Sequence, residues 1–136
     1  MVYIERDLEK ELQKYLNKGE ILAVLGPRQC GKTTLVNRFL DRVEKKKKIS
    51  RVSFDNITTL KLFENDIESF VKQHLEGFDI LFIDEVHYAR DGGKILKYVY
   101  DTFQTKIIIS GSSAAEISIQ SLKYLVGRIL LFRLYP

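Results

Sequence analysis

A short segment with two glycines near the N-terminus says more about this chain than its composition does. The segment reads Gly26-Pro27-Arg28-Gln29-Cys30-Gly31-Lys32-Thr33-Thr34. It fits the phosphate-loop pattern, which is a glycine, four free positions and then Gly-Lys-Ser/Thr. An apolar run rich in strand formers precedes it at residues 21–25, and apolar residues recur at helical spacing after it. A strand, a loop and a helix in this order are the context that such a loop requires.

The residue types of this segment suit the binding of a nucleotide phosphate. Gly26 and Gly31 allow backbone angles and close approaches that a side chain would block. Successive N–H groups can then turn toward a phosphate at the positive N-terminal end of the following helix. We expect residues 26–34 to bind ATP or ADP, with Lys32 reaching the β- and γ-phosphates and the Thr33 hydroxyl binding Mg²⁺. An accidental match in a chain of this length would occur roughly once in two hundred sequences of ordinary composition.

Composition places the chain among single-domain globular proteins. It has 136 residues, of which 45% are hydrophobic and 29% are charged, and such a length can bury one sizeable core. No apolar run approaches the ~20 residues that a membrane span requires, and the N-terminus turns charged too early for a secretory signal. The single cysteine, Cys30, excludes an internal disulfide and suits a reducing cytoplasm, where we expect the protein.

Much of the net charge of +4 comes from a run of four lysines at residues 45–48. Such a run can contact the phosphates of DNA. No aromatic residues alternate with these lysines to stack on bases, and a solvated turn between two elements is the simpler explanation. DNA therefore stays an open partner that charge alone does not establish.

Apolar periodicity predicts strands that alternate with helices. The predicted strands cover residues 20–25, 51–55, 79–84, 106–110 and 128–134, and the predicted helices cover residues 5–17, 32–44, 66–75, 95–103 and 114–124. The central strands are continuously apolar, which is typical of a parallel sheet with helices on both faces. We therefore predict one α/β domain over residues 1–136, a three-layer phosphate-loop core. Because the chain stops directly after an apolar strand, we expect a fragment of a longer protein.

Two adjacent acids, Asp84 and Glu85, follow the apolar run at residues 80–83. In phosphate-loop enzymes an acid at the end of a buried strand holds Mg²⁺ beside the loop, which is the role we expect for Asp84. A glutamate in the next position can polarise the attacking water, which is the role we expect for Glu85. The alternative is a pair of acids that merely ends a strand.

Two further segments are candidates for the γ-phosphate side of the site. The predicted strand at 106–110 runs into Gly111-Ser112-Ser113, where a small polar residue could sense the γ-phosphate. Ser112 is our first candidate and Ser110 our second, although a plain turn explains them nearly as well. Arg128 precedes the last predicted strand, where we expect it beside the loop that borders the nucleotide. It is either an arginine supplied in trans to the γ-phosphate of a neighbouring subunit or a structural surface charge.

Taken together, these segments resemble prokaryotic AAA-type ATPases with a GPR-x-x-GKT loop, a family frequent in archaea. The resemblance is carried by the segments at residues 26–35, 82–85, 109–113 and 125–128 and by the closing Phe132-Arg133-Leu134-Tyr135-Pro136. It implies an ATPase core of the AAA+ type and sites shared between subunits of a homo-oligomer. The family core usually continues into a helical lid and often into a nuclease-like domain, and we expect residues 1–136 to include neither. One departure is His87, where the family commonly has glutamine.

Two rival functions remain on the sequence. Asp84-Glu85-Val86-His87 also resembles the DEVH box of superfamily 2 helicases, but Gly111-Ser112-Ser113 does not match the Ser-Ala-Thr motif that such helicases carry. The other rival is a switch or scaffold that binds ATP and hardly turns it over. Glu85 favours hydrolysis over this second rival.

Overall fold

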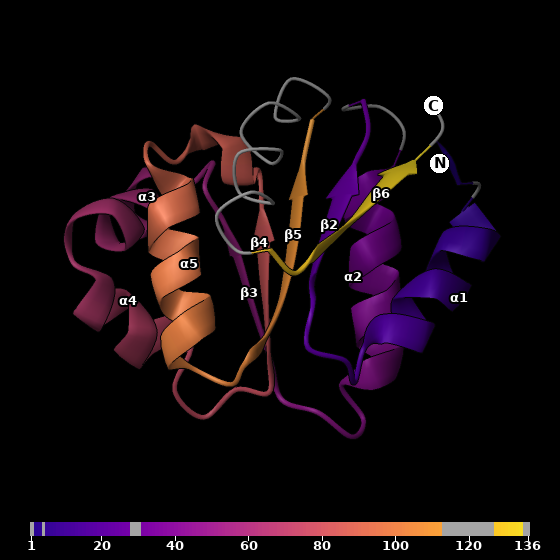
Figure 1. Cartoon of the computed structure of the whole chain (residues 1–136), viewed down its shortest axis with the longest axis horizontal. Coiled ribbons are helices and arrows are strands. Elements are labelled where there is room, and N and C mark those ends of the chain that lie inside the picture. Colours follow the sequence, from indigo (N-terminus) through magenta and orange to yellow (C-terminus); the bar gives the residue numbers. More distant parts are fainter. Residues whose placement is uncertain (1, 4, 28–30, 113–126, 135–136) are drawn as a thin grey trace.

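The computed structural model describes residues 2–3, 5–27, 31–112 and 127–134 of the chain. Six strands form one sheet: β1 (Val2–Tyr3), β2 (Ile21–Leu25), β3 (Ile49–Ser53), β4 (Ile80–Asp84), β5 (Lys106–Gly111) and β6 (Ile129–Leu134). Their order across the sheet is β1-β6-β2-β5-β4-β3, and every pair is parallel (Figure 1). The predicted α/β fold with a parallel sheet is confirmed.

Helices cover both faces of this sheet. They are α1 (Glu5–Tyr15), α2 (Lys32–Val43), α3 (Ile57–Asn65), α4 (Ile67–His74) and α5 (Gly92–Thr102), and a short 3₁₀ turn, η2, spans Val86–Tyr88. Alternate residues of β2 enter different cores, because side chains of a strand point to opposite faces. Ile21, Ala23 and Leu25 pack with residues of α3, α4 and α5, whereas Leu22 and Val24 pack with residues of α1 and α2. The architecture is therefore the expected three layers.

The elements β1, α3 and η2 were not predicted from the sequence, and one strand is shifted. β1 is only two residues long, and α3 begins with β-branched residues that are weak helix formers. Its start is fixed by Asn56, whose Oδ1 accepts hydrogen bonds from the N–H groups of Thr58 and Thr59. The strand predicted at 51–55 lies at 49–53, because Ile49 pairs with Ile80 of β4. The helix predicted at 114–124 lies outside the described residues.

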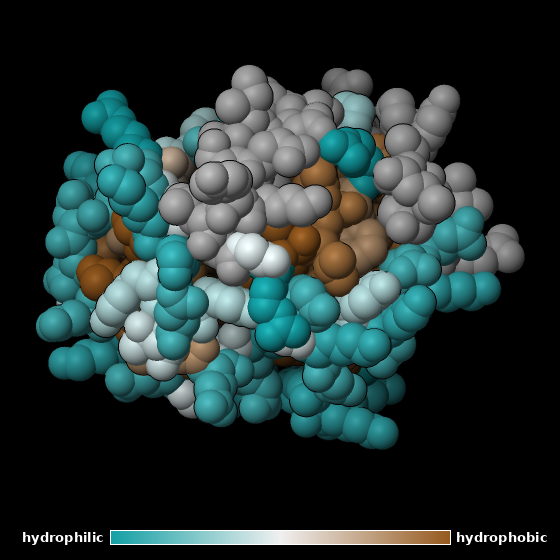
Figure 2. Space-filling model, in the orientation of Figure 1, coloured by the Kyte–Doolittle hydropathy of each residue, from teal (hydrophilic) through white to brown (hydrophobic). Residues whose placement is uncertain are grey.

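The parallel arrangement gives the sheet two unlike edges. All carboxyl ends of the strands lie at one edge, here called the C-terminal edge, and all amino ends lie at the opposite, N-terminal edge. In the view of Figure 2, hydrophilic residues line most of the left and lower sides, and apolar residues are visible toward the middle and in a smaller area at the left.

In the described part of the chain, no helix combines the length and the apolar character that crossing a membrane requires.

Candidate active site

Three candidate segments meet at the C-terminal edge because they follow three neighbouring strands. β2, β5 and β4 are adjacent in the sheet and end at Leu25, Gly111 and Asp84. The N–H of Gly26 donates a hydrogen bond to the carbonyl of Gly111 at 3.3 Å. The phosphate-loop segment thus begins directly beside the end of β5, where open α/β sheets bind their ligands.

The N-cap residue of α2 is Gly31, which provides no side-chain hydrogen bond to cap the helix. Gly31 precedes the helix with φ +78°, a left-handed conformation that glycine adopts without strain. Its carbonyl accepts the N–H of Leu35 at 2.8 Å, but it has no side chain to bind the first amides of the helix. By contrast, α3 and α4 are capped by the side chains of Asn56 and Asp66. The first turn of α2 also contains no acid, so its positive end suits an anion.

Asp84 is fixed by contacts with three residues. The Thr33 hydroxyl, in the first turn of α2, donates to Asp84 Oδ2 at 3.0 Å and lies 3.2 Å from Oδ1. The N–H of Glu85 donates to Oδ1 at 3.0 Å, and the hydroxyl of Ser110 in β5 donates to the same oxygen. A hydroxyl and a carboxylate held together in this way fit Mg²⁺, which prefers oxygen ligands. The structure therefore brings together the two residues that the sequence proposed as metal ligands.

Lys32 and Glu85 are buried together beside this pair. Only 2% of Lys32 and 6% of Glu85 are exposed. Lys32 Nζ lies 3.7 Å from Glu85 Oε1, and His87 Nε2 lies 3.4 Å from Glu85 Oε2. Charges buried in a low-dielectric setting interact more strongly than charges in water. An ammonium, a carboxylate and an imidazole are thus assembled next to the candidate metal ligands.

The two serine candidates lie differently. Ser110 is fully buried and bonded to Asp84, whereas Ser112 is half-buried just beyond the end of β5. The structure thus brings our second candidate, not our first, into contact with the acid. Pro27 and Thr34 are exposed at the two ends of the phosphate-loop segment. Arg28, Gln29 and Cys30 lie outside the described residues, so their predicted contacts with nucleotide stay predictions.

Arg128 does not lie beside the phosphate loop of its own chain, and that expectation was wrong. Its carbonyl accepts the N–H of Ile21, the first residue of β2, at 3.0 Å. Its exposed guanidinium lies over Gly19, where a β-carbon would be 3.5 Å from Nη1. Because β6 is parallel to β2, the residue before β6 lies at the N-terminal edge. The length of β2 therefore separates Arg128 from Gly26, which leaves a role in trans or a structural surface charge for this residue.

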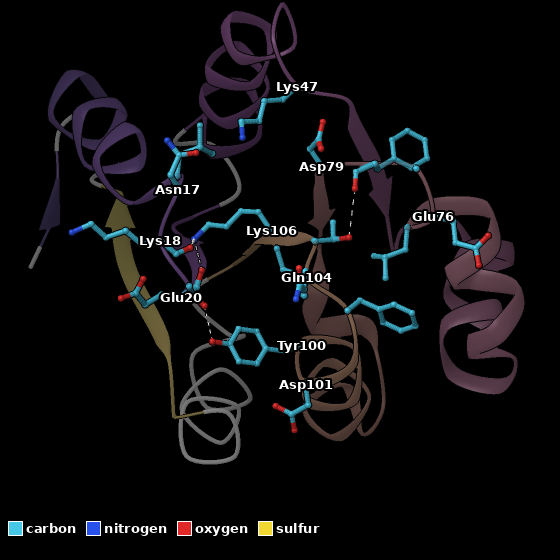
Figure 3. Close-up of a pocket in the computed structure, with 18 residues that line it drawn as sticks. Asn17, Lys18, Glu20, Lys47, Glu76, Asp79, Tyr100, Asp101, Gln104 and Lys106 are labelled. Carbon is cyan, nitrogen blue, oxygen red and sulfur yellow. Dashed lines mark hydrogen bonds between the residues drawn. The ribbon is translucent and has the colours of Figure 1, made fainter.

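A cavity of about 860 Å³ opens at this N-terminal edge (Figure 3). Two of its polar side chains bind the protein's own backbone. Lys106 Nζ donates to the carbonyls of Lys18, at 2.8 Å, and of Glu20, and the Tyr100 hydroxyl donates to the carbonyl of Gly19 at 2.6 Å. Burial lowers the pKa of Lys106 to about 8, although the nearby Glu20 opposes this shift. These contacts hold the segment before β2, and we place the candidate site at the other edge.

A sequence model of the family described as "AAA domain" matches residues 18–136 of the chain. The chain belongs to this family. Among curated proteins, the AAA domain is 32% identical over 120 residues to the uncharacterized protein MJ1637 of Methanocaldococcus jannaschii. That match covers 81% of this chain and 25% of the archaeal protein, so the chain spans about a quarter of its relative's length.

Solved structures of similar fold include two bacterial proteins. AMPPCP-bound DnaA from Aquifex aeolicus matches with a TM-score of 0.63 and 16% identity, over 93% of this chain and 44% of that one. A RuvB variant from Thermotoga maritima matches with a TM-score of 0.63 and 22% identity, over 96% and 43% of the respective chains. At these identities the likeness supports the fold of the AAA domain and leaves its activity to be argued from the site.

Sequence reasoning missed one contact in the site. His87 was noted as a departure from the family pattern, but its contact with Glu85 was not foreseen. The signal was their spacing of two residues directly after a buried strand. A tight turn in that position can bring the two side chains together, and only the backbone of η2 shows that it does.

Proposed function

We propose that this AAA domain binds ATP or ADP with Mg²⁺ at the C-terminal edge of its sheet and hydrolyses ATP. The observation that carries the proposal is the contact between the Thr33 hydroxyl and the Asp84 carboxylate at the uncapped start of α2. This contact supports the proposal because a hydroxyl and a carboxylate oxygen, which are groups that can bind Mg²⁺, lie beside a helix N-terminus that favours anions. The membership of the chain in the AAA domain family supports the same function.

Each residue of the proposed site has a distinct role. Lys32 binds phosphate oxygens through its ammonium, which acts strongly because it is buried. Thr33 and Asp84 would hold Mg²⁺, which offsets negative charge on the phosphates. Glu85 accepts the proton of the attacking water as a general base. Ser110 fixes the orientation of Asp84 through its hydrogen bond, and Ser112 remains a proposed sensor of the γ-phosphate.

The decisive experiment separates nucleotide binding from hydrolysis. We expect Mg²⁺-dependent ATP turnover by the wild-type protein, and a loss of about 10²–10⁴-fold in Glu85→Gln, because an amide cannot accept the proton of water. Titration with a fluorescent ATP analogue should show that Glu85→Gln still binds nucleotide. If the wild type binds ATP but does not turn it over faster than Glu85→Gln, the protein is a nucleotide-dependent switch instead.

We further propose that the site is completed by a neighbouring copy in a homo-oligomer. The support is that Arg128 is exposed at the surface, where its guanidinium lies over Gly19 and away from the proposed site of its own chain. An arginine supplied in trans stabilises the charge that develops on the transferred phosphoryl group. A separate candidate partner is DNA, whose phosphates the lysines at 45–48 could contact. Measuring ATP turnover with and without DNA tests whether DNA is a partner.

A further inference from the structure

We propose that His87 is a positioning residue, which holds the carboxylate of Glu85 in the orientation that activates water. This inference rests on the proposed hydrolysis of ATP and concerns a residue without a role in that proposal. It starts from the contact of 3.4 Å between His87 Nε2 and Glu85 Oε2. Both side chains are largely buried, with 18% of the His87 side chain and 8% of the Glu85 side chain exposed.

The backbone after β4 is shaped to make this contact. Glu85 has φ +54°, a left-handed conformation that is unfavourable for a residue with a β-carbon. Such a conformation persists only where the surroundings fix it, and here the N–H of Glu85 is bonded to Asp84 Oδ1. The chain then turns through η2, and the N–H of Tyr88 donates to the carbonyl of Glu85 at 3.3 Å. This turn directs His87 back toward the carboxylate two residues earlier.

The two oxygens of Glu85 have different partners. Oε1 faces Lys32 Nζ at 3.7 Å, and Oε2 faces His87 Nε2. In the proposed function the ammonium of Lys32 is also required by the phosphates, which compete with Glu85 for it. In the proposed function His87 does not bind the phosphates. Its contact with Glu85 can therefore persist while Lys32 binds phosphate.

The nitrogens of His87 indicate how it acts. Nδ1 is buried without a hydrogen-bond partner in the described part of the chain, so a proton on Nδ1 would be unsatisfied. A proton on Nε2 can instead be donated to Glu85 Oε2, which is itself buried without a hydrogen bond among the described residues. The hydrogen bond forms when His87 Nε2 and Glu85 Oε2 move slightly closer than 3.4 Å. Catalytic hydrogen bonds commonly shorten in this way when substrate binds. His87 therefore acts as an N–H donor to the general base.

The test compares the removal of this donor with its replacement. His87→Leu removes the N–H, whereas His87→Gln offers an amide N–H. We expect kcat to fall about 10–100-fold in His87→Leu, the range for losing a hydrogen bond to a charged group, and to recover largely in His87→Gln. The affinity for an ATP analogue should match wild type in both variants. His74→Leu is the control, because His74 is the chain's other histidine and packs on the Phe70 ring of α4.

A double variant distinguishes positioning of Glu85 from a general structural effect. In a Glu85→Gln background, His87→Leu should cause little further loss, because the group that it positions is already gone. Wild-type kcat in His87→Leu, or an equal further loss in the Glu85→Gln background, would refute the role of His87 and leave the proposed hydrolysis intact. Equal turnover by wild type and Glu85→Gln would refute the proposed hydrolysis itself, and with it the role of His87.

Discussion

Two lysines at opposite edges of the sheet, the half-buried Lys106 and the buried Lys32, are used in different ways. At the N-terminal edge, Lys106 donates to two backbone carbonyls of its own chain, from Lys18 and Glu20. At the C-terminal edge, Lys32 is 2% exposed, and its partner Glu85 lies 3.7 Å from its ammonium. Lys106 thus binds the backbone of its own chain, whereas Lys32 faces the Glu85 carboxylate at the start of α2, where we propose that phosphate binds.

The difference extends to the groups around each lysine. The carbonyls of Lys18, Gly19 and Glu20 are all bound by side chains of α5 and β5. At the other edge, Glu85 Oε2 makes no hydrogen bond among the described residues, and α2 begins at a glycine. Buried oxygens without a hydrogen bond are costly at either edge, and Glu20 Oε2 at the N-terminal edge also makes none among the described residues. What suits the C-terminal edge to an anion is the start of α2, where Gly31 offers no side-chain cap. The cavity at the N-terminal edge is therefore not the proposed site, which lies at the C-terminal edge around Lys32 and Glu85.

The largest expected effect is the loss of ATP turnover in Arg128→Ala. It would show whether Arg128, at the N-terminal edge, contributes to catalysis in a neighbouring subunit. An arginine supplied in trans contributes on the order of 10³–10⁵ in rate in GTPases. We expect a loss of that order in Arg128→Ala, and partial recovery when Arg128→Ala and Lys32→Ala proteins are mixed and turnover is measured. Arg42→Ala is a matched control, because Arg42 is an exposed arginine that pairs with Glu9 on the surface. No recovery in a mixture with proven subunit exchange would make Arg128 a structural residue.

A smaller effect concerns nucleotide affinity and tests the two lysines directly. Lys32→Ala should weaken the binding of an ATP analogue by about 10–100-fold, since it removes charged hydrogen bonds to phosphate. Lys106→Met should leave that affinity unchanged, because Lys106 contacts the segment before β2 at the opposite edge. Fluorescence titration of both variants measures the contrast, and equal affinities for Lys32→Ala and wild type would remove the phosphate site from α2.

The smallest effect is on stability and its pH dependence. Lys106→Met should lower the free energy of unfolding by about 1–2 kcal/mol at pH 7, because two backbone acceptors lose their donor. The pKa of Lys106 is about 8 in the folded protein, below its ordinary value of 10.5. Between these values the unfolded chain binds more protons than the folded one, so wild type gains stability relative to Lys106→Met as pH rises from 8 toward 10.5. Urea unfolding at pH 7 and at about pH 9.5 measures this gain, and parallel pH profiles would contradict it.

The sequence was sufficient for the fold class and for the residues that meet at the C-terminal edge. Continuous apolar runs predicted a parallel sheet, and in such a sheet the residues that follow Leu25 and Ile83 must lie at one edge. The contact of Thr33 with Asp84 follows from that rule. The roles of these residues in binding and hydrolysis stay predictions.

The sequence was insufficient to place residues whose position depends on the direction of a strand or on a local turn or cap. Arg128 was placed beside the loop from its motif, whereas the direction of β6 sends it to the opposite edge. Ser112 was preferred over Ser110 because it follows the strand, but the pleat of β5 turns Ser110 toward Asp84. α3 escaped detection because its cap at Asn56 outweighs the weak helix propensity of the residues that follow.

The central position of β2 also has a consequence for how the protein is made. Leu22 pairs with Ile108 of β5 on one side and with Leu130 of β6 on the other, so both partners are synthesised long after β2 itself. Closing such long loops slows folding, and an unpaired apolar strand invites association with other chains. We expect the nascent chain to need protection by chaperones until β6 has left the ribosome. A nucleotide that binds only the folded domain then stabilises it at a late stage of folding, after β2 has paired with β5 and β6.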